Sequence, residues 1–353
     1  MMQYQQLGAT GAFVSRLALG GSTFGGADVP VYNVIGGLSQ QDADRMVGVA
    51  LDAGVNLFDT ADIYAGGESE MRLGAALRAH RQDVMLSTKV FHRMGPGPNN
   101  VGHSRLHLMR ALDESLKRLQ TDYIDLYQLH LYDPVTGFEE ILRTLDDAVR
   151  AGKVRYLGCS NLTAWQTMKA LGVSEWQGLE KFVCVQAYYS LAGRDIEREI
   201  LPMVEDQKLG LMTWSALAGG LLTGKFTRSR NPNDGSRRLQ LDFPPVDVEQ
   251  SYDVIDVLLE IASRENVSVA QVAIAWQLHN PAVTSVILGA RNLEQLQDNL
   301  DAVAVKLSQA DMAALDAASK LKMEYPQWLQ SRPAARFPGE KRVSPIKDDP
   351  KQS

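Results

Sequence analysis

The sequence has few cysteines, no long hydrophobic run and no excess of basic residues. Its two cysteines, Cys159 and Cys184, fall in strands that we expect to be buried, which argues against a disulfide framework and is typical of a reducing compartment. No stretch approaches the roughly 18 apolar residues of a transmembrane helix, and no charged region followed by an apolar run opens the chain. We therefore expect a soluble, cytoplasmic protein with two inert core thiols.

Basic residues are outnumbered by acidic ones, 36 Lys and Arg against 42 Asp and Glu, for a formal net charge of −6. This balance gives no general attraction for nucleic acid or anionic membranes, so we expect neither as a partner. An anionic ligand must then be held by a local cluster of basic side chains. The composition sets no oligomeric state.

The chain does contain enough apolar material for a large core. Hydrophobic residues make up 45% and charged residues 22% of its 353 residues, the ordinary balance of a globular protein. We assign residues 1–330 to a single domain. Residues 331–353 are rich in proline and charge and poor in apolar side chains, so we expect a poorly ordered C-terminal extension.

Short apolar runs alternate with longer helical patterns, which predicts repeated βα units and a parallel sheet. Helical spacing is clear in Ser104–Leu119, where Leu108, Leu112 and Leu116 share one face. The eight expected strands are Leu17–Gly20, Val55–Asp59, Val84–Val90, Tyr123–His130, Val154–Ser160, Phe182–Gln186, Leu211–Ser215 and Ser285–Gly289. Eight units without a break in composition favour an α/β fold of the closed (β/α)8 TIM barrel type over a doubly wound sheet.

Two further features surround the predicted barrel. Tyr4–Leu7 and Phe13–Ser15 flank a glycine-containing turn, so a β-hairpin is expected to precede the barrel and cover its bottom. Phe24–Leu38 and Gly224–Val246 are too long for simple connections, and we interpret both as candidate active-site loops.

Polar residues gather at or just beyond the C-terminal ends of the predicted strands. Each alone has an ordinary structural explanation, such as a helix cap for a carboxylate or a satisfied core position for a histidine. Their convergence on one rim favours function, because that face of an α/β barrel carries its active site. The set comprises Asp59, Lys89, His130, Ser160, Asn161, Gln186, Ser215 and Arg291.

Asp59, Lys89 and His130, with the loop residue Tyr64, make a coherent acid–base site. A phenol with a pKa near 10 needs a positive neighbour to donate its proton near neutral pH. Lys89 can supply roughly 4 kcal/mol at about 4 Å, or about three pKa units before the cost of burial is subtracted. Asp59 would hold the ammonium group, and His130 would hydrogen-bond the reacting oxygen or relay a proton.

These four residues stand in the segments NLFDTADIYAGGESEMRLGAAL, VMLSTKV and IDLYQLH. The segments resemble the signatures of the aldo-keto reductase family, and GKVRYLGCSN, VQAYYSL, WSALAGGLLTGKF and ILGARNLEQLQDNL extend the resemblance from Gly8 to Leu307. The pattern is most similar to the bacterial branch that resembles potassium-channel β subunits. The resemblance implies that Asp59, Tyr64, Lys89 and His130 are a catalytic tetrad with Tyr64 as general acid in carbonyl reduction.

The resemblance also implies a nicotinamide cofactor site along the rim. Ser160, Asn161 and Gln186 would hold the carboxamide, and Trp214 would stack on the nicotinamide. The remaining implied cofactor contacts are Ser215, Leu217, Gly219 and Lys225 on a loop over the pyrophosphate, and Gly289, Arg291, Gln295, Asp298 and Asn299 at the adenosine-phosphate end. Arg291, with Arg237 and Arg238 beside it, favours NADPH or NADP⁺, with NADH as a weaker alternative.

Two other motifs carry less weight. GGSTFGG at Gly20–Gly26 lacks the G-x-G-x-x-G spacing of a dinucleotide fingerprint. His103 and His107 have a spacing that could chelate a metal, yet no HExxH motif or acidic ligand accompanies them. We therefore expect an exposed helical histidine pair and no metal site.

The expected partner is a small carbonyl or alcohol substrate. Phe24, Tyr32, Phe91 and Trp328 are candidate apolar walls of its pocket, although each could equally pack its own loop. Two alternatives remain: an NADP⁺-dependent alcohol or sugar dehydrogenase, and a low-turnover NADPH-binding regulatory protein. His130 favours an enzyme, because the channel subunits that the chain resembles carry asparagine at that position.

Overall fold

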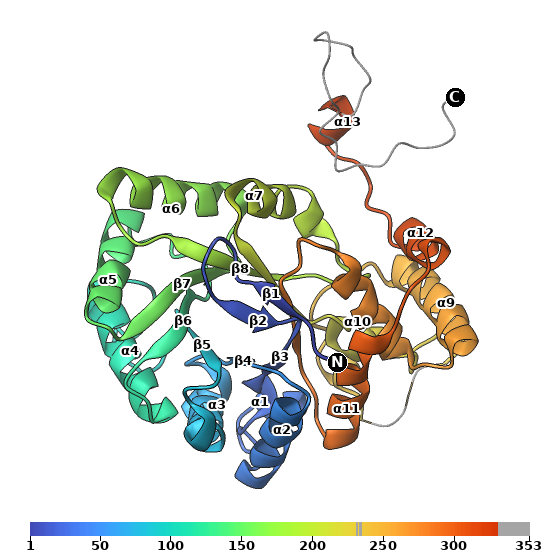
Figure 1. Ribbon diagram of the computed structural model, residues 1–353, viewed down its shortest axis with the longest axis horizontal. Helices are drawn as coiled ribbons and strands as arrows, with labels where there is room; N and C mark the ends of the chain where they lie inside the picture. Colours follow the sequence, from blue (N-terminus) through green and yellow to red (C-terminus); the bar gives the residue numbers. More distant parts are fainter. Residues whose placement is uncertain (231, 233–234, 331–353) are drawn as a thin grey trace.

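Eight parallel strands close into a barrel in the computed structural model, which describes residues 1–230, 232 and 235–330 (Figure 1). Their order is β3 to β9 and then β10, which pairs with β3. The strands are β3 (Leu17–Gly20), β4 (Leu57–Asp59), β5 (Met85–Val90), β6 (Ile124–Leu129), β7 (Val154–Ser160), β8 (Phe182–Tyr188), β9 (Gly210–Trp214) and β10 (Ser285–Leu288). The predicted (β/α)8 TIM barrel is confirmed. The extension expected at residues 331–353 lies outside the described residues.

Helices surround the barrel and cover the outer faces of its strands (Figure 1). They are α1 (Tyr32–Ile35), α2 (Gln40–Asp52), α3 (Glu68–Leu77), α4 (Arg105–Leu119), α5 (Phe138–Arg150), α6 (Ala164–Gln177), α7 (Ile200–Gln207), α8 (Arg237–Gln240), α9 (Val248–Glu265), α10 (Val269–His279), α11 (Leu293–Asp301), α12 (Gln309–Ala318) and α13 (Gln327–Gln330). Short 3-10 turns include η1 (Gly21–Thr23), η2 (Tyr64–Gly67), η3 (Arg78–His80), η4 (Asp195–Glu197), η5 (Ala218–Thr223) and η6 (Ala302–Ala304).

The predicted strands and helix agree closely with the structure. β3 and β7 have the expected bounds, and the other six strands differ by one or two residues at one or both ends. α4 begins one residue after the predicted Ser104, because the Ser104 side chain caps the helix by accepting a hydrogen bond from the His107 N–H. Apolar periodicity thus located the elements, and side-chain capping decided where α4 begins.

The inside of the barrel changes from apolar to polar along its strands. Near the bottom, Leu57, Leu126, Cys184 and Met212 form a separate buried apolar cluster. Two residues further along the same strands, on the same face, come Asp59, Gln128, Gln186 and Trp214. Because side chains two residues apart on a strand point the same way, a polar layer lies above the apolar layer, on the side of the barrel mouth.

The predicted N-terminal hairpin closes the bottom of this apolar layer. β1 (Tyr4–Gln6) pairs antiparallel with β2 (Phe13–Ser15), and Leu7 and Val14 join the apolar cluster inside the barrel. Figure 1 shows the hairpin lying across that end of the barrel. Gly8 has φ +58°, and a Cβ there would collide with the carbonyl of Val183, so this turn requires glycine.

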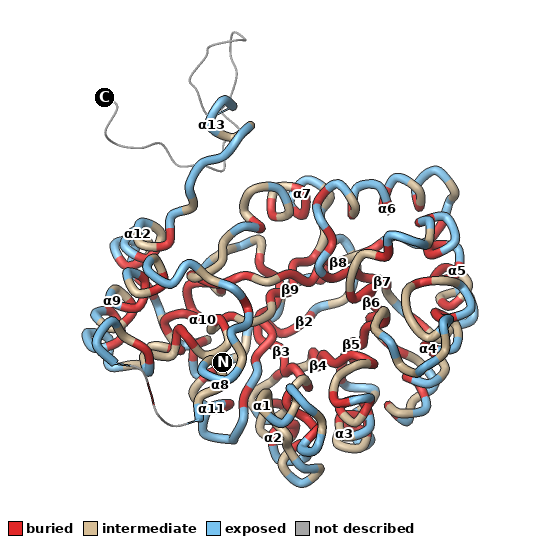
Figure 2. Tube along the Cα trace, turned by 180° about the vertical axis from the view of Figure 1, so that it is seen from behind, coloured by how far each residue is buried: buried red, intermediate tan, exposed pale blue. Residues whose placement is uncertain are grey.

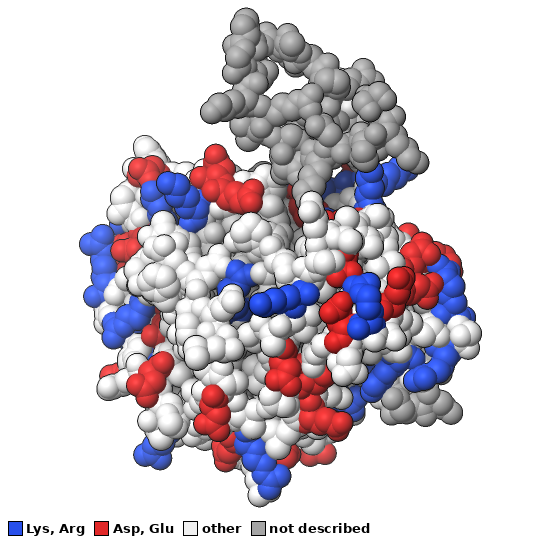
Figure 3. All heavy atoms as spheres, turned by 45° about the vertical axis from the view of Figure 1, so that its right-hand side comes forward, with Lys and Arg blue, Asp and Glu red and all other residues white. Residues whose placement is uncertain are grey.

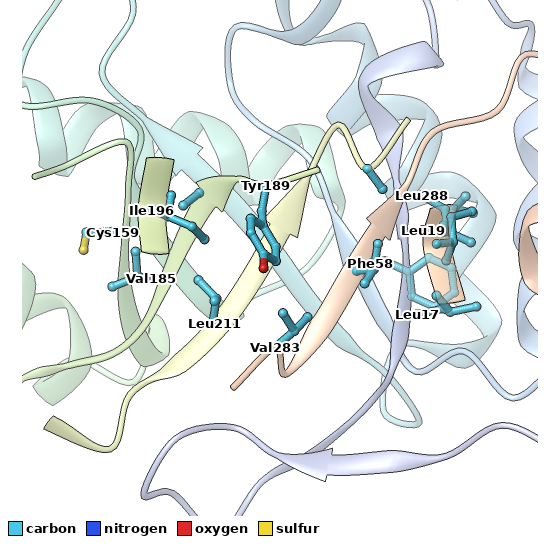
Figure 4. Packing of buried hydrophobic residues seen from close by; sticks show 14 of the residues in the cluster. Leu17, Leu19, Phe58, Cys159, Val185, Tyr189, Ile196, Leu211, Val283 and Leu288 are labelled. Carbon is cyan, nitrogen blue, oxygen red and sulfur yellow. The ribbon is translucent and has the colours of Figure 1, made fainter. Parts of the chain in front are cut away.

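The main core lies between the strands and the helices. Leu17, Leu19, Phe58 and Leu288 meet on neighbouring strands in Figure 4, and Figure 2 shows buried strands inside a ring of helices with exposed outer faces. Both cysteines are buried and unbridged, as expected. Within the described ranges, no helix combines the length and apolar character needed to cross a bilayer. Acidic and basic side chains are interspersed on the face seen in Figure 3.

Candidate active site

Lys89 is the centre of a compact group at the C-terminal ends of β4, β5 and β6. Its Nζ lies 2.6 Å from Oδ2 of Asp59, 2.7 Å from the Thr60 carbonyl oxygen and 3.4 Å from the Tyr64 hydroxyl. The His130 ring stands edge-on to the Tyr64 ring, with centroids 5.8 Å apart. The structure therefore brings together the four residues proposed as catalytic.

The Asp59 carboxylate is held from its other oxygen by three side chains of the polar layer. Oδ1 accepts hydrogen bonds from Ser87 Oγ at 2.9 Å, Gln186 Nε2 at 3.0 Å and Gln128 Nε2 at 3.3 Å. These bonds offset part of the cost of burying a carboxylate and an ammonium group together. Gln186 is 2% exposed, so its amide N–H supports Asp59 rather than pointing to solvent.

A short turn after β4 carries Tyr64 over the ammonium group. The backbone N–H of Thr60 donates to the Ser87 carbonyl, and that of Asp62 donates to the Lys89 carbonyl. η2 then reverses the chain with positive φ at Ala65, Gly66 and Gly67 before α3 begins. This geometry keeps the phenol above β5 and leaves Tyr64 only partly buried.

Burial outweighs the lysine charge at Tyr64, which corrects the simple charge argument. Burial raises the pKa of Tyr64, the Lys89 ammonium opposes this, and the Asp59 carboxylate adds to the rise. Burial also acts to lower the pKa of Lys89, but the Asp59 carboxylate 2.6 Å away and the neighbouring Tyr64 together more than offset it, and the net pKa is raised. The site thus holds a charged lysine beneath a protonated phenol.

His130 is a neutral imidazole at neutral pH. Burial lowers its pKa well below the usual value, and the positive charge of Lys89 lowers it further. Nδ1 has no hydrogen-bond partner in the described part of the chain, and His92 packs edge-on at 4.8 Å. A neutral ring beside Tyr64 can donate a hydrogen bond to an oxygen without adding charge.

Asn161 links the rim residues of three strands. Its Nδ2 donates to the His130 carbonyl and to Ser160 Oγ, each at 3.0 Å, and its Oδ1 accepts from Trp214 Nε1 at 3.2 Å. Asn161 has φ +57°, a conformation that asparagine tolerates better than most residues. The proposed carboxamide contacts Ser160 and Asn161 therefore lie directly beside His130 and Trp214.

The loop after β9 is ordered by hydrogen bonds between its own residues. Ser215 Oγ accepts from the Gly219 N–H at 3.1 Å, and the Leu217 carbonyl accepts from the N–H groups of Gly220 and Leu222. Lys225 lies exposed at the end of this loop. A Cβ on Gly219 would collide with the carbonyl of Phe243, so glycine here permits the predicted loop Gly224–Val246 to fold over the loop after β9.

The residues proposed for the adenosine end surround the start of α11, but several are bonded to one another. Gln295 Oε1 accepts from the Arg291 N–H, and Asn299 Nδ2 donates to the Gly289 carbonyl at 3.4 Å. Asp298 accepts from Ser268 and Gln271, which fastens α11 to α10. In this arrangement Gly289 and Arg291 are exposed, whereas Asn299 is buried.

A basic cluster of Arg237, Arg238 and Arg291 lies next to this end. Burial lowers the pKa of Arg237, and the positive charges of Arg238 and Arg291 lower it further, so both repel the Arg237 guanidinium. Arg238 is paired with Asp242 at 2.6 Å, but Nε of Arg237 is buried without a hydrogen-bond partner among the described residues. An anion would satisfy this group and relieve the repulsion.

Two of the four proposed substrate walls are wrong. Phe24 is 0% exposed and belongs to the core, so it offers no surface to a ligand. Trp328 is on α13, which stands away from the barrel, and its ring lies against Tyr325 (Figure 1). Tyr32 does lie beside Tyr64, with ring centroids 6.4 Å apart, and Phe91 packs between His92 and His103.

The expectation that His103 and His107 form an exposed pair is also wrong, because both residues are buried. His103 precedes α4 and donates from Nε2 to the Val90 carbonyl, and burial lowers its pKa to about 4. His107 faces the core on the first turn of α4. No group of three or more potential metal ligands occurs in the part of the chain that the structure describes.

The sequence interpretation missed two parts of the site. Ser87 and Gln128 precede Lys89 and His130 by two residues, so the period of two was the available signal for their facing the same interior. Phe243 was missed because nothing local in the sequence places it: its ring stacks on Trp214 with centroids 5.8 Å apart and planes 11° apart. That contact depends on how Gly224–Val246 folds back over the barrel.

A buried carboxyl group near Tyr64 was missed as well. Asp62 is 0% exposed, and neither of its oxygens has a hydrogen-bond partner among the described residues. Burial raises its pKa to about 8, with a further rise from Glu70. Glu70 itself pairs with Arg118 at 2.6 Å, which leaves Asp62 as the unpaired member of this buried group.

The fold and the site define a (β/α)8 barrel with an acid–base group at its functional rim. The model of the Aldo/keto reductase family matches residues 16–320, and the chain belongs to this family. Members of the family generally use nicotinamide cofactors. The relatives include several named as oxidoreductases, and together these findings support an oxidoreductase that acts on carbonyl groups in general.

Three relatives illustrate the range of the similarity. An uncharacterized oxidoreductase, YrpG, of Bacillus subtilis is 37% identical over 89% of this chain and 95% of its own length. A probable voltage-gated potassium channel subunit beta of Arabidopsis thaliana is 37% identical over 86% of this chain and 92% of its own. Versiconal hemiacetal acetate reductase of Aspergillus parasiticus is 31% identical over 89% and 96%.

Proposed function

We propose that the protein reduces aldehydes or ketones to alcohols with NADPH, reversibly, and that Tyr64 is the general acid. The observation that carries this proposal is the position of Lys89 Nζ, 2.6 Å from Asp59 and 3.4 Å from the Tyr64 hydroxyl. A charged lysine beneath a protonated phenol is suited to proton donation to a carbonyl oxygen, because the ammonium stabilises the phenolate that remains.

Each member of the group has a separate role in this proposal. Tyr64 gives its proton to the carbonyl oxygen, and Lys89 stabilises the developing phenolate. Asp59 positions Lys89 and keeps it charged within the barrel. His130, neutral and beside the phenol, orients the substrate oxygen by a hydrogen bond. General acid catalysis of this kind supplies roughly 10²–10⁴-fold, and a bound nicotinamide supplies the hydride.

The rim fits such a cofactor. Ser160, Asn161 and Gln186 would hold the carboxamide, and Trp214 would provide an aromatic surface. Ser215, Leu217, Gly219 and Lys225 would contact the pyrophosphate. Gly289, Arg291, Gln295, Asp298 and Asn299 would hold the adenosine end. Gln186, Gln295 and Asp298 already make hydrogen bonds within the chain. We therefore expect these three residues to contribute to cofactor binding mainly by holding neighbouring residues in position.

The preference for NADPH over NADH rests on the arginine cluster. Arg237 has a buried Nε without a partner in the described residues, and Arg291 is exposed beside it. A phosphate would bond to guanidinium groups in their preferred fork geometry and offset the repulsion among Arg237, Arg238 and Arg291. NADH lacks the extra phosphate, so we expect weaker binding.

The substrate is proposed to be an aromatic or aliphatic carbonyl compound. Tyr32 beside Tyr64, with Phe91 behind His92, would give the mouth apolar walls. Putative aryl-alcohol dehydrogenases of Schizosaccharomyces pombe, 34% identical, are among the relatives, which favours oxidation of an alcohol as the second candidate.

Steady-state assays test both directions. NADPH absorbance should fall in the presence of 4-nitrobenzaldehyde and other aromatic aldehydes. Faster reduction of NADP⁺ by aryl alcohols would favour the dehydrogenase. An intact protein that binds NADPH but turns over neither a carbonyl nor an alcohol panel would contradict the enzymatic proposal.

A further inference from the structure

The outer face of α6 carries two exposed tryptophans. Trp165 is 57% exposed and Trp176 80% exposed, at opposite ends of a helix that lies on the outside of the barrel (Figures 1 and 2). The helix is well defined at both ends, by a capping box between Thr163 and Gln166 and by Gly178 at φ +64°. Large aromatic side chains that remain in water on a rigid helix are typical of a contact surface.

The exposed residues of this helix form a stripe with symmetric spacing. Trp165, Lys169, Gly172 and Trp176 are all exposed and follow one another at intervals of 4, 3 and 4 residues. This is the alternation of a and d positions in a coiled-coil seam, so the four residues face the same way. Read from either end, the intervals are the same.

Gly172 has no evident role within the chain. Glycine is among the least favourable residues in the middle of a helix. On α3 a helical glycine has a clear reason, since a Cβ on Gly74 would collide with the backbone of Leu119 at the end of α4, whereas Gly48 of α2 has no such contact. A Cβ on Gly172 would meet nothing within 4 Å outside its own helix in the described part of the chain. The space above Gly172 is open to another molecule.

We propose that α6 packs antiparallel against α6 of a second copy of this chain, about a twofold axis. In an antiparallel seam each a position faces a d position. Trp165 then lies against Trp176 of the second copy, twice, and Lys169 lies over Gly172 of the second copy, twice. Glycine leaves room for the aliphatic part of the lysine, whose ammonium group reaches water at the edge.

The symmetric spacing of the stripe favours a second copy of this chain as the partner of α6. Reversal of the stripe places each tryptophan against a tryptophan, as a twofold interface requires. Trp165 packs against Tyr132 of the same chain, with ring centroids 6.3 Å apart. The four indoles would bury roughly 400–700 Å². This is about a quarter to under half of the roughly 1,600 Å² of a standard interface, so Met168 and neighbouring surfaces must contribute.

Sedimentation velocity over a range of concentrations tests the proposal. The wild-type protein should associate as its concentration rises. Trp176→Ala should weaken association at least about 30-fold, the loss typical of an interfacial hot spot. Gly172→Gln should also weaken association, because its side chain fills the space for Lys169, yet it should raise the melting temperature because glutamine favours the helix. Leu106→Ala on α4, which removes another exposed apolar side chain, should change nothing.

A cross-linking experiment fixes the register. Under mild oxidation, an equal mixture of the Lys169→Cys and Gly172→Cys proteins should form disulfide-linked dimers faster than either variant alone. The native Cys159 and Cys184 are buried and will not compete. A wild-type protein that stays monomeric, association that Trp176→Ala and Gly172→Gln leave unchanged, or equal cross-linking in all three samples would overturn the proposal. Capture of a different protein by a monomeric wild type would also overturn it.

Discussion

The ring of Phe243 lies parallel to the indole of Trp214, with centroids 5.8 Å apart and planes inclined by 11°. Tyr188 packs beside the same indole at 5.2 Å. Under the proposed function, a nicotinamide would use the aromatic surface that Phe243 covers. Phe243 is held there by the fold of the loop over Gly219, so cofactor binding and loop position are coupled.

Phe243→Ala should therefore tighten NADPH binding. An aromatic pair contributes about 0.5–1.5 kcal/mol beyond area burial, so losing this competitor should lower the Kd by about 2- to 10-fold. Quenching of the intrinsic tryptophan fluorescence on titration with NADPH measures the change. Phe13→Ala, in the distant hairpin, is the matched control. Weaker binding by Phe243→Ala would mean that the ring supports the cofactor instead of competing with it.

Asp59→Asn should be strongly destabilising. The variant leaves the Lys89 ammonium buried without a carboxylate, and breaking a buried ion pair in this way costs about 3–5 kcal/mol. Without the carboxylate, burial should lower the pKa of Lys89 in the folded variant below its value in the unfolded chain. Between these two pKa values the unfolded chain binds more protons than the folded one, so the free energy of unfolding of the variant should rise with pH up to about 10. Urea denaturation at several pH values measures both effects.

Glu114→Gln provides the comparison for this variant. It breaks the exposed Lys117–Glu114 pair, for which a loss of about 0–1 kcal/mol is typical. Losses of similar size for Asp59→Asn and Glu114→Gln would contradict the structural role given to Asp59.

Asp62 should make the protein less stable as the pH rises from about 4 to about 8. Its folded pKa is raised to about 8 by burial and by Glu70, whereas an unfolded aspartate titrates near 4. Within this window the folded Asp62 keeps a proton that the unfolded state has lost, so the contribution of Asp62 to the free energy of unfolding falls by up to about 1.4 kcal/mol per pH unit.

Asp62→Asn should remove this contribution. The free energy of unfolding of the variant should therefore increase relative to that of the wild type as the pH rises. Urea unfolding at pH 5, 6, 7 and 8 measures the difference. Asp122→Asn, at an exposed position, should leave the wild-type slope unchanged. A constant difference between Asp62→Asn and wild type across the range would show that Asp62 is not a buried acid of raised pKa.

Arg291→Ala should raise the KM for NADPH and have a smaller effect on kcat at saturating cofactor. Loss of one charge-assisted phosphate contact costs about 1.5–3 kcal/mol, or about 10- to 150-fold in affinity. The KM for NADH should change much less. Arg78→Ala, on the exposed η3 turn, is the control. An equal effect on the two cofactors would place Arg291 away from the distinguishing phosphate.

Local pattern was sufficient for the barrel and for the convergence of its rim. Strand periodicity located Asp59, Lys89 and His130, because all three end a buried run and must meet at one face. The same reasoning could not assign Phe24 or Trp328, since contacts between distant segments decide whether an aromatic ring enters the core or leaves the barrel. His103 and His107 were misjudged for the same reason.

Electrostatics at the site also needed the structure. From sequence, the effect of Lys89 on the pKa of Tyr64 was given before the cost of burial was subtracted, and the degree of burial and the direct Asp59 pair reverse the net effect. The contact of Phe243 with Trp214 and the missing partner of Asp62 both depend on how loops and helices close over the barrel, which has no local sequence signal.

Turnover by the Tyr64→Phe variant tests the central claim most directly. Phenylalanine keeps the ring beside Tyr32 and His130 and removes only the hydroxyl that lies 3.4 Å from Lys89 Nζ. Measured with saturating NADPH and an aromatic aldehyde, kcat should fall by about 10²–10⁴-fold while the Kd for NADPH stays within about twofold of wild type. Wild-type kcat in a variant that still binds NADPH would contradict the assignment of Tyr64 as the proton donor.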